Sequence, residues 1–142
     1  MSILERRCVT VDIERLKNNR DYEYDDPIWG GCDQIVMFYK EMPEFKITFW
    51  DYHFDNIFYQ AEYHGIEWTG FTRDFHACKR TLDFGKEPIA IGDLDEYLND
   101  LYSYKDKMAK HENPESRECY KLICDFLAYA KETGMTVMVE EE

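Results

Sequence analysis

The chain of 142 residues contains very little serine, with only Ser2, Ser103 and Ser116. It also contains no G-x-S-x-G, no phosphate-binding loop, no G-x-G-x-x-G and no H-E-x-x-H. These motifs carry serine hydrolase, nucleotide-binding and metalloprotease chemistry. Ser2 is terminal, and we expect the other two serines on or near helix surfaces. The sequence therefore favours binding over catalysis, and we predict that the protein is not an enzyme.

Long apolar runs are absent as well. The longest, Ile35–Tyr39, is far shorter than the roughly 20 residues of a membrane span. The first residues, MSILERRC, show no apolar segment typical of a signal peptide. The five cysteines are odd in number and none has C-x-x-C spacing, which indicates reduced thiols rather than a disulfide framework. We predict a cytoplasmic protein with no membrane attachment.

Basic residues are few compared with acidic ones. The chain has 17 Lys and Arg against 30 Asp and Glu, giving a formal net charge of −13. Binding to nucleic acid or to anionic lipid needs positive charge, so neither is expected directly. The excess of acidic residues would attract a basic protein through long-range electrostatics. A basic protein partner is therefore the predicted ligand.

Aromatic residues are plentiful, with 11 Tyr, 9 Phe and 3 Trp. Hydrophobic residues make up 44% of the chain, enough for one core in a single globular domain over 1–142. The rings exceed what such a core needs, and exposed Tyr and Trp are common anchors of protein interfaces. The composition predicts a domain with a binding surface.

Turn-forming residues divide the middle of the chain into short segments. In these segments apolar and polar residues alternate, or β-branched and aromatic residues are frequent. The short links between them predict an antiparallel meander over 34–72, with strands at 34–40, 45–53, 57–63 and 66–72. Further strands are predicted at 8–13 and 135–139. Residues 17–33 resemble a long loop, and 74–92 indicate no definite element.

One stretch, FWDYHFDN at 49–56, places Asp51, His53 and Asp55 at alternate positions. On a strand these side chains would share a side, as metal ligands do. We interpret Asp51 and His53 as the point where the strand leaves the core, and Asp55 as part of the following turn.

The C-terminal part predicts two helices. Asp93 and Glu96 have capping-box spacing and begin a helix over about 93–110. Asn113 and Pro114 begin a second over 114–133. Its expected buried stripe consists of Cys119, Leu122, Ile123, Phe126, Leu127 and Ala130. Both helices are expected on one face of a mostly antiparallel sheet of about five to six strands, an α+β fold whose other sheet face is partly open.

Two acidic segments are the candidate binding sites. No Lys or Arg occurs between Lys86 and Lys105, so the outward face of the first helix lacks the cations that usually alternate with acids. Its candidate residues are Asp95, Glu96, Asn99, Asp100, Tyr102 and Asp106. The second segment, in the predicted loop, consists of Tyr22, Glu23, Tyr24, Asp25 and Asp26. Carboxylates there would pair with Arg and Lys of a partner, and the rings would stack on it.

These patterns favour a small acidic inhibitor of a basic, nucleic-acid-acting protein, of the general kind of toxin immunity proteins and phage-encoded inhibitors. One alternative is an accessory subunit that binds through an open sheet face with Trp50, Tyr52 and Trp68. Another is a metal- or cysteine-dependent enzyme. It would use Asp51, His53, His76 and Cys78, with Lys79 and Arg80 beside the thiol, and a zinc site would add His64 to His53, His76 and Cys78. None of these residues has a diagnostic spacing, and no cofactor or metal is predicted.

Overall fold

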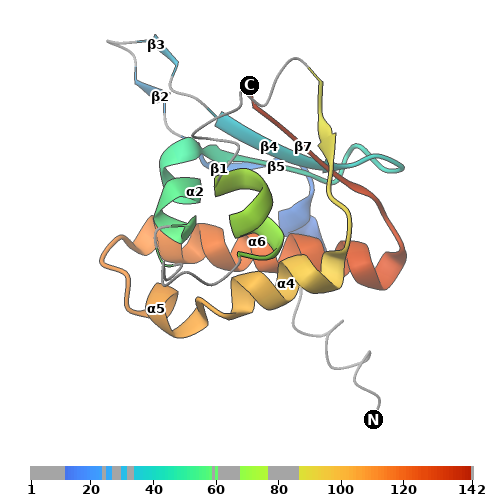
Figure 1. Cartoon of the computed structure of the whole chain (residues 1–142). Helices are drawn as coiled ribbons and strands as arrows, with labels where there is room; N and C mark the ends of the chain where they lie inside the picture. The colour runs from blue at the N-terminus through green and yellow to red at the C-terminus, as the bar shows by residue number, and fades with distance from the viewer. Residues whose placement is uncertain are drawn as a thin grey trace.

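The computed structural model describes residues 12–23, 25–26, 30–31, 34–58, 60, 68–76 and 87–141. A five-stranded sheet forms one layer, and the helices α2, α4 and α6 lie on the same side of it (Figure 1). This arrangement confirms the α+β class. The strand order is β1-β5-β4-β7-β6. The bounds are β1 (Asn19–Tyr22), β4 (Gln34–Tyr39), β5 (Lys46–Trp50), β6 (Ile89–Ala90) and β7 (Val137–Glu141).

The sheet is mostly antiparallel, as predicted, but it is mixed rather than purely antiparallel. Strand β1 pairs parallel with β5, whereas β4 pairs antiparallel with both β5 and β7. Two further short strands, β2 (Asp25–Asp26) and β3 (Gly30–Gly31), pair with each other outside the main sheet. The predicted loop 17–33 therefore contributes an edge strand. Its polar sequence gave no signal for one, because an edge strand is stabilised largely by pairing with its neighbour.

The predicted meander is correct for its first two strands and wrong after Trp50. Strand β5 continues directly into helix α2 (Asp51–Phe58), and residues 70–76 are also helical, with a π-helical turn η2 at Thr72–His76. Phe54 and Ile57 are almost fully buried on α2, at a spacing that suits a helix. Residues 59 and 61–67 lie outside the described residues. In FWDYHFDN only Phe49 and Trp50 belong to β5, whereas Asp51, His53 and Asp55 all lie on α2, so the interpretation of Asp55 as a turn residue is wrong.

The first predicted strand is wrong where it can be tested. Residues 8–11 lie outside the described residues, and Ile13 begins a short 3-10 helix, η1 (Ile13–Leu16). Asp12 caps that turn by accepting a hydrogen bond from the Glu14 backbone at 3.2 Å. The predicted strand therefore does not extend to Ile13, where a side chain able to cap a turn precedes a helical turn.

Helix α6 (Pro114–Thr133) has the predicted bounds. Asn113 accepts hydrogen bonds from the backbone N–H groups of Glu115 and Ser116, and Gly134 ends the helix at a φ of 75°. The predicted stripe on α6 is 2% exposed or less throughout. The predicted helix 93–110 is instead two helices, α4 (Leu94–Tyr102) and α5 (Lys105–Ala109). At the break between them, the buried Tyr104 donates its hydroxyl hydrogen to Asp100 at 2.9 Å.

The core lies between the sheet and the helices. Tyr39 of β4 donates its hydroxyl hydrogen to the backbone oxygen of Phe126 at 2.6 Å, and the two rings are 4.3 Å apart. The opposite sheet face is not open at its centre, since Val36 and Thr48 are at most 2% exposed. Among the described helices, none combines the length and the hydropathy needed to cross a bilayer.

Candidate functional site

The acidic residues of α4 fall on two faces. Asp95, Asn99 and Tyr102 are exposed at spacings of four and three residues, which place them on one side of the helix. Asp106 is exposed in the first turn of α5. We call these four residues the exposed stripe. It is the part of the predicted helix surface that stays available to a partner.

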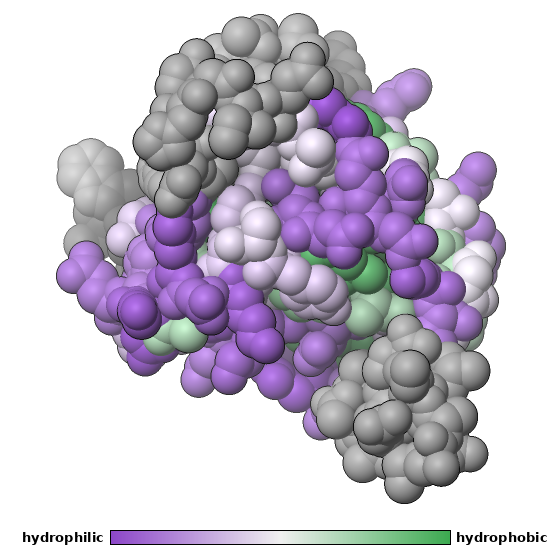
Figure 2. Space-filling model, turned by 60° about the horizontal axis from the view of Figure 1, so that its bottom comes forward, coloured by the Kyte–Doolittle hydropathy of each residue, from purple (hydrophilic) through white to green (hydrophobic). Residues whose placement is uncertain are grey.

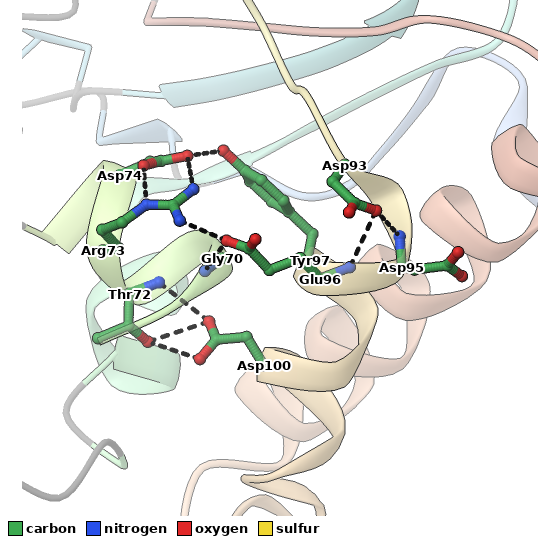
Figure 3. Close-up of polar contacts among 9 residues, drawn as sticks. All are labelled: Gly70, Thr72, Arg73, Asp74, Asp93, Asp95, Glu96, Tyr97 and Asp100. Atoms are coloured by element: carbon green, nitrogen blue, oxygen red, sulfur yellow. Dashed lines mark hydrogen bonds and ion pairs between the residues drawn. The ribbon is translucent and has the colours of Figure 1, made fainter. Parts of the chain in front are cut away.

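The neighbouring face of α4 is directed into the protein and meets residues 70–76 (Figure 3). Glu96 accepts a hydrogen bond from the backbone N–H of Gly70 at 3.0 Å. Asp100 accepts one from the backbone N–H of Thr72 at 2.9 Å. The first N–H groups of a helix have no partner within it, so these two carboxylates cap the segment 70–76. Glu96 and Asp100 therefore bind a segment of their own chain, contrary to the prediction.

Asp100 is the more buried of the two, with 7% exposure. Besides the Thr72 backbone, it accepts hydrogen bonds from the hydroxyls of Thr72 at 3.0 Å and Tyr104 at 2.9 Å. Burial raises the pKa of the Asp100 carboxyl, while these hydrogen bonds act in the opposite direction. The prediction that Asp100 faces a partner is wrong, because this carboxylate already has three donors inside the fold.

Arg73 supplies the cation that the α4 sequence lacks. Its guanidinium group pairs with Glu96 of α4 and with Asp74, the latter at 2.7 Å from Nε (Figure 3). Tyr97 donates its hydroxyl hydrogen to Asp74. The hydrogen bond from Arg73 lowers the pKa of the Asp74 carboxyl. Asp95 is paired in a similar way, with Lys131 of α6, so two of the acids are matched by cations from distant parts of the chain.

Gly70 makes this close approach of the two segments possible. Its φ is +57°, and a Cβ there would lie 2.7 Å from the Cβ of Asp100 and 3.0 Å from the backbone oxygen of Glu96. Glycine is the residue that accepts both the positive φ and the short distance. The sequence analysis missed this position. The available signal was a glycine directly before the buried Phe71 in TGFT.

The second predicted segment does not form one exposed binding loop. Tyr22 is 5% exposed in β1, and its hydroxyl oxygen accepts a hydrogen bond from Arg15 at 2.7 Å. Glu23 is half-buried and pairs with Arg20. Tyr24 lies outside the described residues, and Asp25–Asp26 forms strand β2. Tyr22 is therefore a core residue, contrary to the prediction that these rings face a partner.

His53 and Ser116 form a contact that the sequence did not suggest. His53 Nδ1 and Ser116 Oγ are 2.7 Å apart, and Asn56 donates to the same Oγ at 2.9 Å. Both His53 and Ser116 are at most 1% exposed, so the expected surface position of Ser116 is wrong. Burial lowers the pKa of His53, although Glu115 acts in the opposite direction. The arrangement resembles a base beside a nucleophile, but the buried Ser116 Oγ is not accessible to a substrate. The His53–Ser116 contact instead joins α2 to α6.

The residues of the alternative metal or thiol site are only partly described. His64, Cys78 and the side chain of His76 lie outside the described residues, and His53 is directed to Ser116. Within the described part of the chain, no group of three or more His, Cys, Asp and Glu side chains is placed to hold a metal ion. The absence of a cofactor stays a prediction.

Comparison with known proteins finds no family model, no curated protein and no solved structure that matches the chain. The functional argument therefore depends on the geometry above. Four predicted residues form the exposed stripe: Asp95, Asn99, Tyr102 and Asp106. Four others are engaged within the fold: Tyr22, Glu23, Glu96 and Asp100.

Proposed function

We propose that the protein is a small acidic binding protein of the cytoplasm that inhibits or neutralises a basic partner, such as a protein that acts on nucleic acid. The exposed stripe carries the proposal. Tyr102 is 49% exposed, which makes it the most exposed of the three large hydrophobic side chains that are exposed in the described part of the chain. It lies between Asn99 and Asp106, on a protein with a net charge of −13.

In this mechanism the carboxylates of the stripe take the place that phosphate groups would occupy on the partner. Arg and Lys of the partner pair with Asp95 and Asp106, and the ring of Tyr102 supplies apolar contact and stacking. The present pair between Asp95 and Lys131 has side chains that are 63% and 44% exposed. Such exposed pairs contribute little to stability, so Asp95 can exchange Lys131 for a cation of the partner.

The test is affinity capture from a lysate of the source cells, followed by binding measurements with the captured protein. The stripe variant combines Tyr102→Ala with Asp106→Lys. Asp100 stays unchanged, because a substitution there would disturb the fold rather than the surface. We expect a basic partner whose affinity falls as salt rises, and a loss of at least about tenfold in affinity for the stripe variant.

The matched control is Met42→Ala with Glu44→Lys. Met42 is 37% exposed and Glu44 is exposed, in the turn between β4 and β5. The control removes an apolar side chain and reverses one charge, as the stripe variant does. Equal affinity of the stripe and control variants, or a captured partner that is acidic, would contradict the proposal.

A second candidate function is an accessory subunit with an aromatic contact surface. The rings of Trp50 and Tyr52 are 4.5 Å apart, and Tyr52 is 42% exposed. This pair lies at the junction of β5 and α2, so the surface is not the open sheet face that the sequence suggested. If this surface binds the partner, Tyr52→Ala will weaken the captured complex while the stripe variant leaves it unchanged.

A further inference from the structure

A groove of about 800 Å³ runs between α5 and α6, on a face distinct from the contact between α4 and residues 70–76. Its apolar floor includes Met108, Tyr120 and Cys124. Hydrophilic side chains cover most of the helical side of the molecule in Figure 2, and hydrophobic surface shows mainly in the recesses between them. The groove falls within the range of 300–1,000 Å³ typical of small-molecule sites.

The walls of the groove carry positive charge on an acidic protein. Lys105 comes from α5, and Arg117 and Lys121 come from α6. Both lysines are exposed. Arg117 donates from Nη1 to the backbone oxygen of His111, which leaves its other nitrogen atoms as donors for a ligand.

Two carboxylates also line the groove, but they lie toward another part of the protein. Asp125 interacts electrostatically with Arg15 as well as Lys121, and Glu118 interacts with Tyr22 of β1. At about 100° per residue, Arg117 and Lys121 lie about 40° apart around α6, and Glu118 lies on the far side of Lys121 from Arg117. The cations therefore border the apolar floor, and the acids occupy the edge next to η1 and β1.

An apolar floor with cations at its rim is complementary to a ligand with an apolar body and one anionic group. The hydroxyl of Tyr120 is already used, since it donates to the backbone oxygen of Leu101, so its ring presents apolar surface. We propose that this groove binds a small anionic amphiphile, an aromatic or aliphatic carboxylate whose body lies on Met108 and Tyr120 and whose carboxylate pairs with Lys105 and Lys121. The groove adjoins the exposed stripe, because Tyr102 is also one of its lining residues, but its binding of a small ligand does not depend on the proposed function.

The test uses 2-naphthoate as the probe and amide chemical shifts of the full chain as the readout. We expect saturable binding with a Kd below about 1 mM, with shifts concentrated in α5 and in the first half of α6. Neutral 2-naphthamide is expected to bind about tenfold more weakly, because it cannot form the charge-assisted contacts. Equal affinity for both probes, or shifts spread over the whole chain, would overturn the proposal.

Two variants locate the site. Lys105→Gln with Lys121→Gln is expected to weaken 2-naphthoate binding by about tenfold. The control, Lys40→Gln with Lys131→Gln, removes the same charge at positions outside the groove and is expected to change affinity less than about twofold. Ala109→Trp, which fills the groove from α5, is expected to abolish binding while the thermal unfolding midpoint is kept. Unchanged binding in either groove variant would overturn the assignment.

Discussion

The carboxylate of Asp100 on α4 accepts hydrogen bonds from both the backbone N–H and the hydroxyl of Thr72, at 2.9 and 3.0 Å. This contact joins two helical segments that are 28 residues apart in the chain. Substituting Asp100 by alanine leaves the Thr72 N–H, the Thr72 hydroxyl and the Tyr104 hydroxyl without their acceptor. Each buried donor left unsatisfied costs about 1–3 kcal/mol.

We therefore expect Asp100→Ala to lower the free energy of unfolding by about 3 kcal/mol, as measured by urea denaturation. The matched control is Asp95→Ala, on the same helix and with an exposed ion pair. It is expected to change stability by less than about 0.5–1 kcal/mol. Similar losses in the two variants would show that the Asp100 contact does not hold residues 70–76 against α4.

Gly70→Ala is expected to destabilise the protein by about 2–4 kcal/mol, from the left-handed backbone and from overpacking. The added Cβ would meet backbone and Cβ atoms of α4, at 2.7 Å in the closest case, and neither can rotate away. Gly92→Ala is the control, because a Cβ there has no neighbour within 4 Å. It is expected to be neutral or slightly stabilising. A loss of stability at Gly92 equal to that at Gly70 would contradict the close-approach argument.

Ser116→Ala is expected to cost about 1–3 kcal/mol, because His53 Nδ1 and the Asn56 amide then lose their buried partner. Ser103→Ala removes the same hydroxyl from an exposed position between α4 and α5, and its expected effect is below about 0.5 kcal/mol. Thermal or urea unfolding of the two variants distinguishes the positions. If Ser116→Ala were as stable as Ser103→Ala, the contact between α2 and α6 would not depend on this hydroxyl.

The stability of the protein is expected to fall as the pH drops below about 6.5, the ordinary pKa of histidine. Burial lowers the pKa of His53 in the folded state, with Glu115 and His111 also acting on the ring. In that pH range the unfolded chain takes up a proton at His53 that the folded chain does not, so acid favours unfolding. The contribution of His53 to stability is fully present above the pKa that this residue has in the unfolded chain. It is lost progressively as the pH falls toward the lower pKa of His53 in the folded chain.

Urea denaturation at about pH 7.5 and pH 5.5, the range in which histidine titrates, tests this expectation. The decrease in stability between the two pH values should be smaller in His53→Gln than in the original chain. Comparing the decreases, rather than the absolute stabilities, removes the effect of the substitution on packing. An unchanged decrease would show that His53 does not titrate differently in the folded and unfolded chains.

Local signals predicted several elements correctly. The Asn113 cap, Pro114 and Gly134 defined α6, because the groups that satisfy or end a helix lie within a few residues of its termini. Strands β4 and β5 followed from apolar segments joined by a short turn. The side chain of Asp93 caps α4 as predicted. In each case the stabilising interactions are close in sequence, so the sequence pattern carries them.

The remaining features depend on contacts between distant residues. Whether Asp95 or Asp100 faced solvent was decided by residues 70–76, whose first N–H groups need acceptors. FWDYHFDN was compatible with both a strand and a helix, and the burial of Phe54 and Ile57 accompanies a helix. The sequence by itself determined the acidic charge, the α+β class and the limits of α6. Only the tertiary structure decided which carboxylates remain on the surface, because a buried donor without an acceptor costs more than an exposed acid gains.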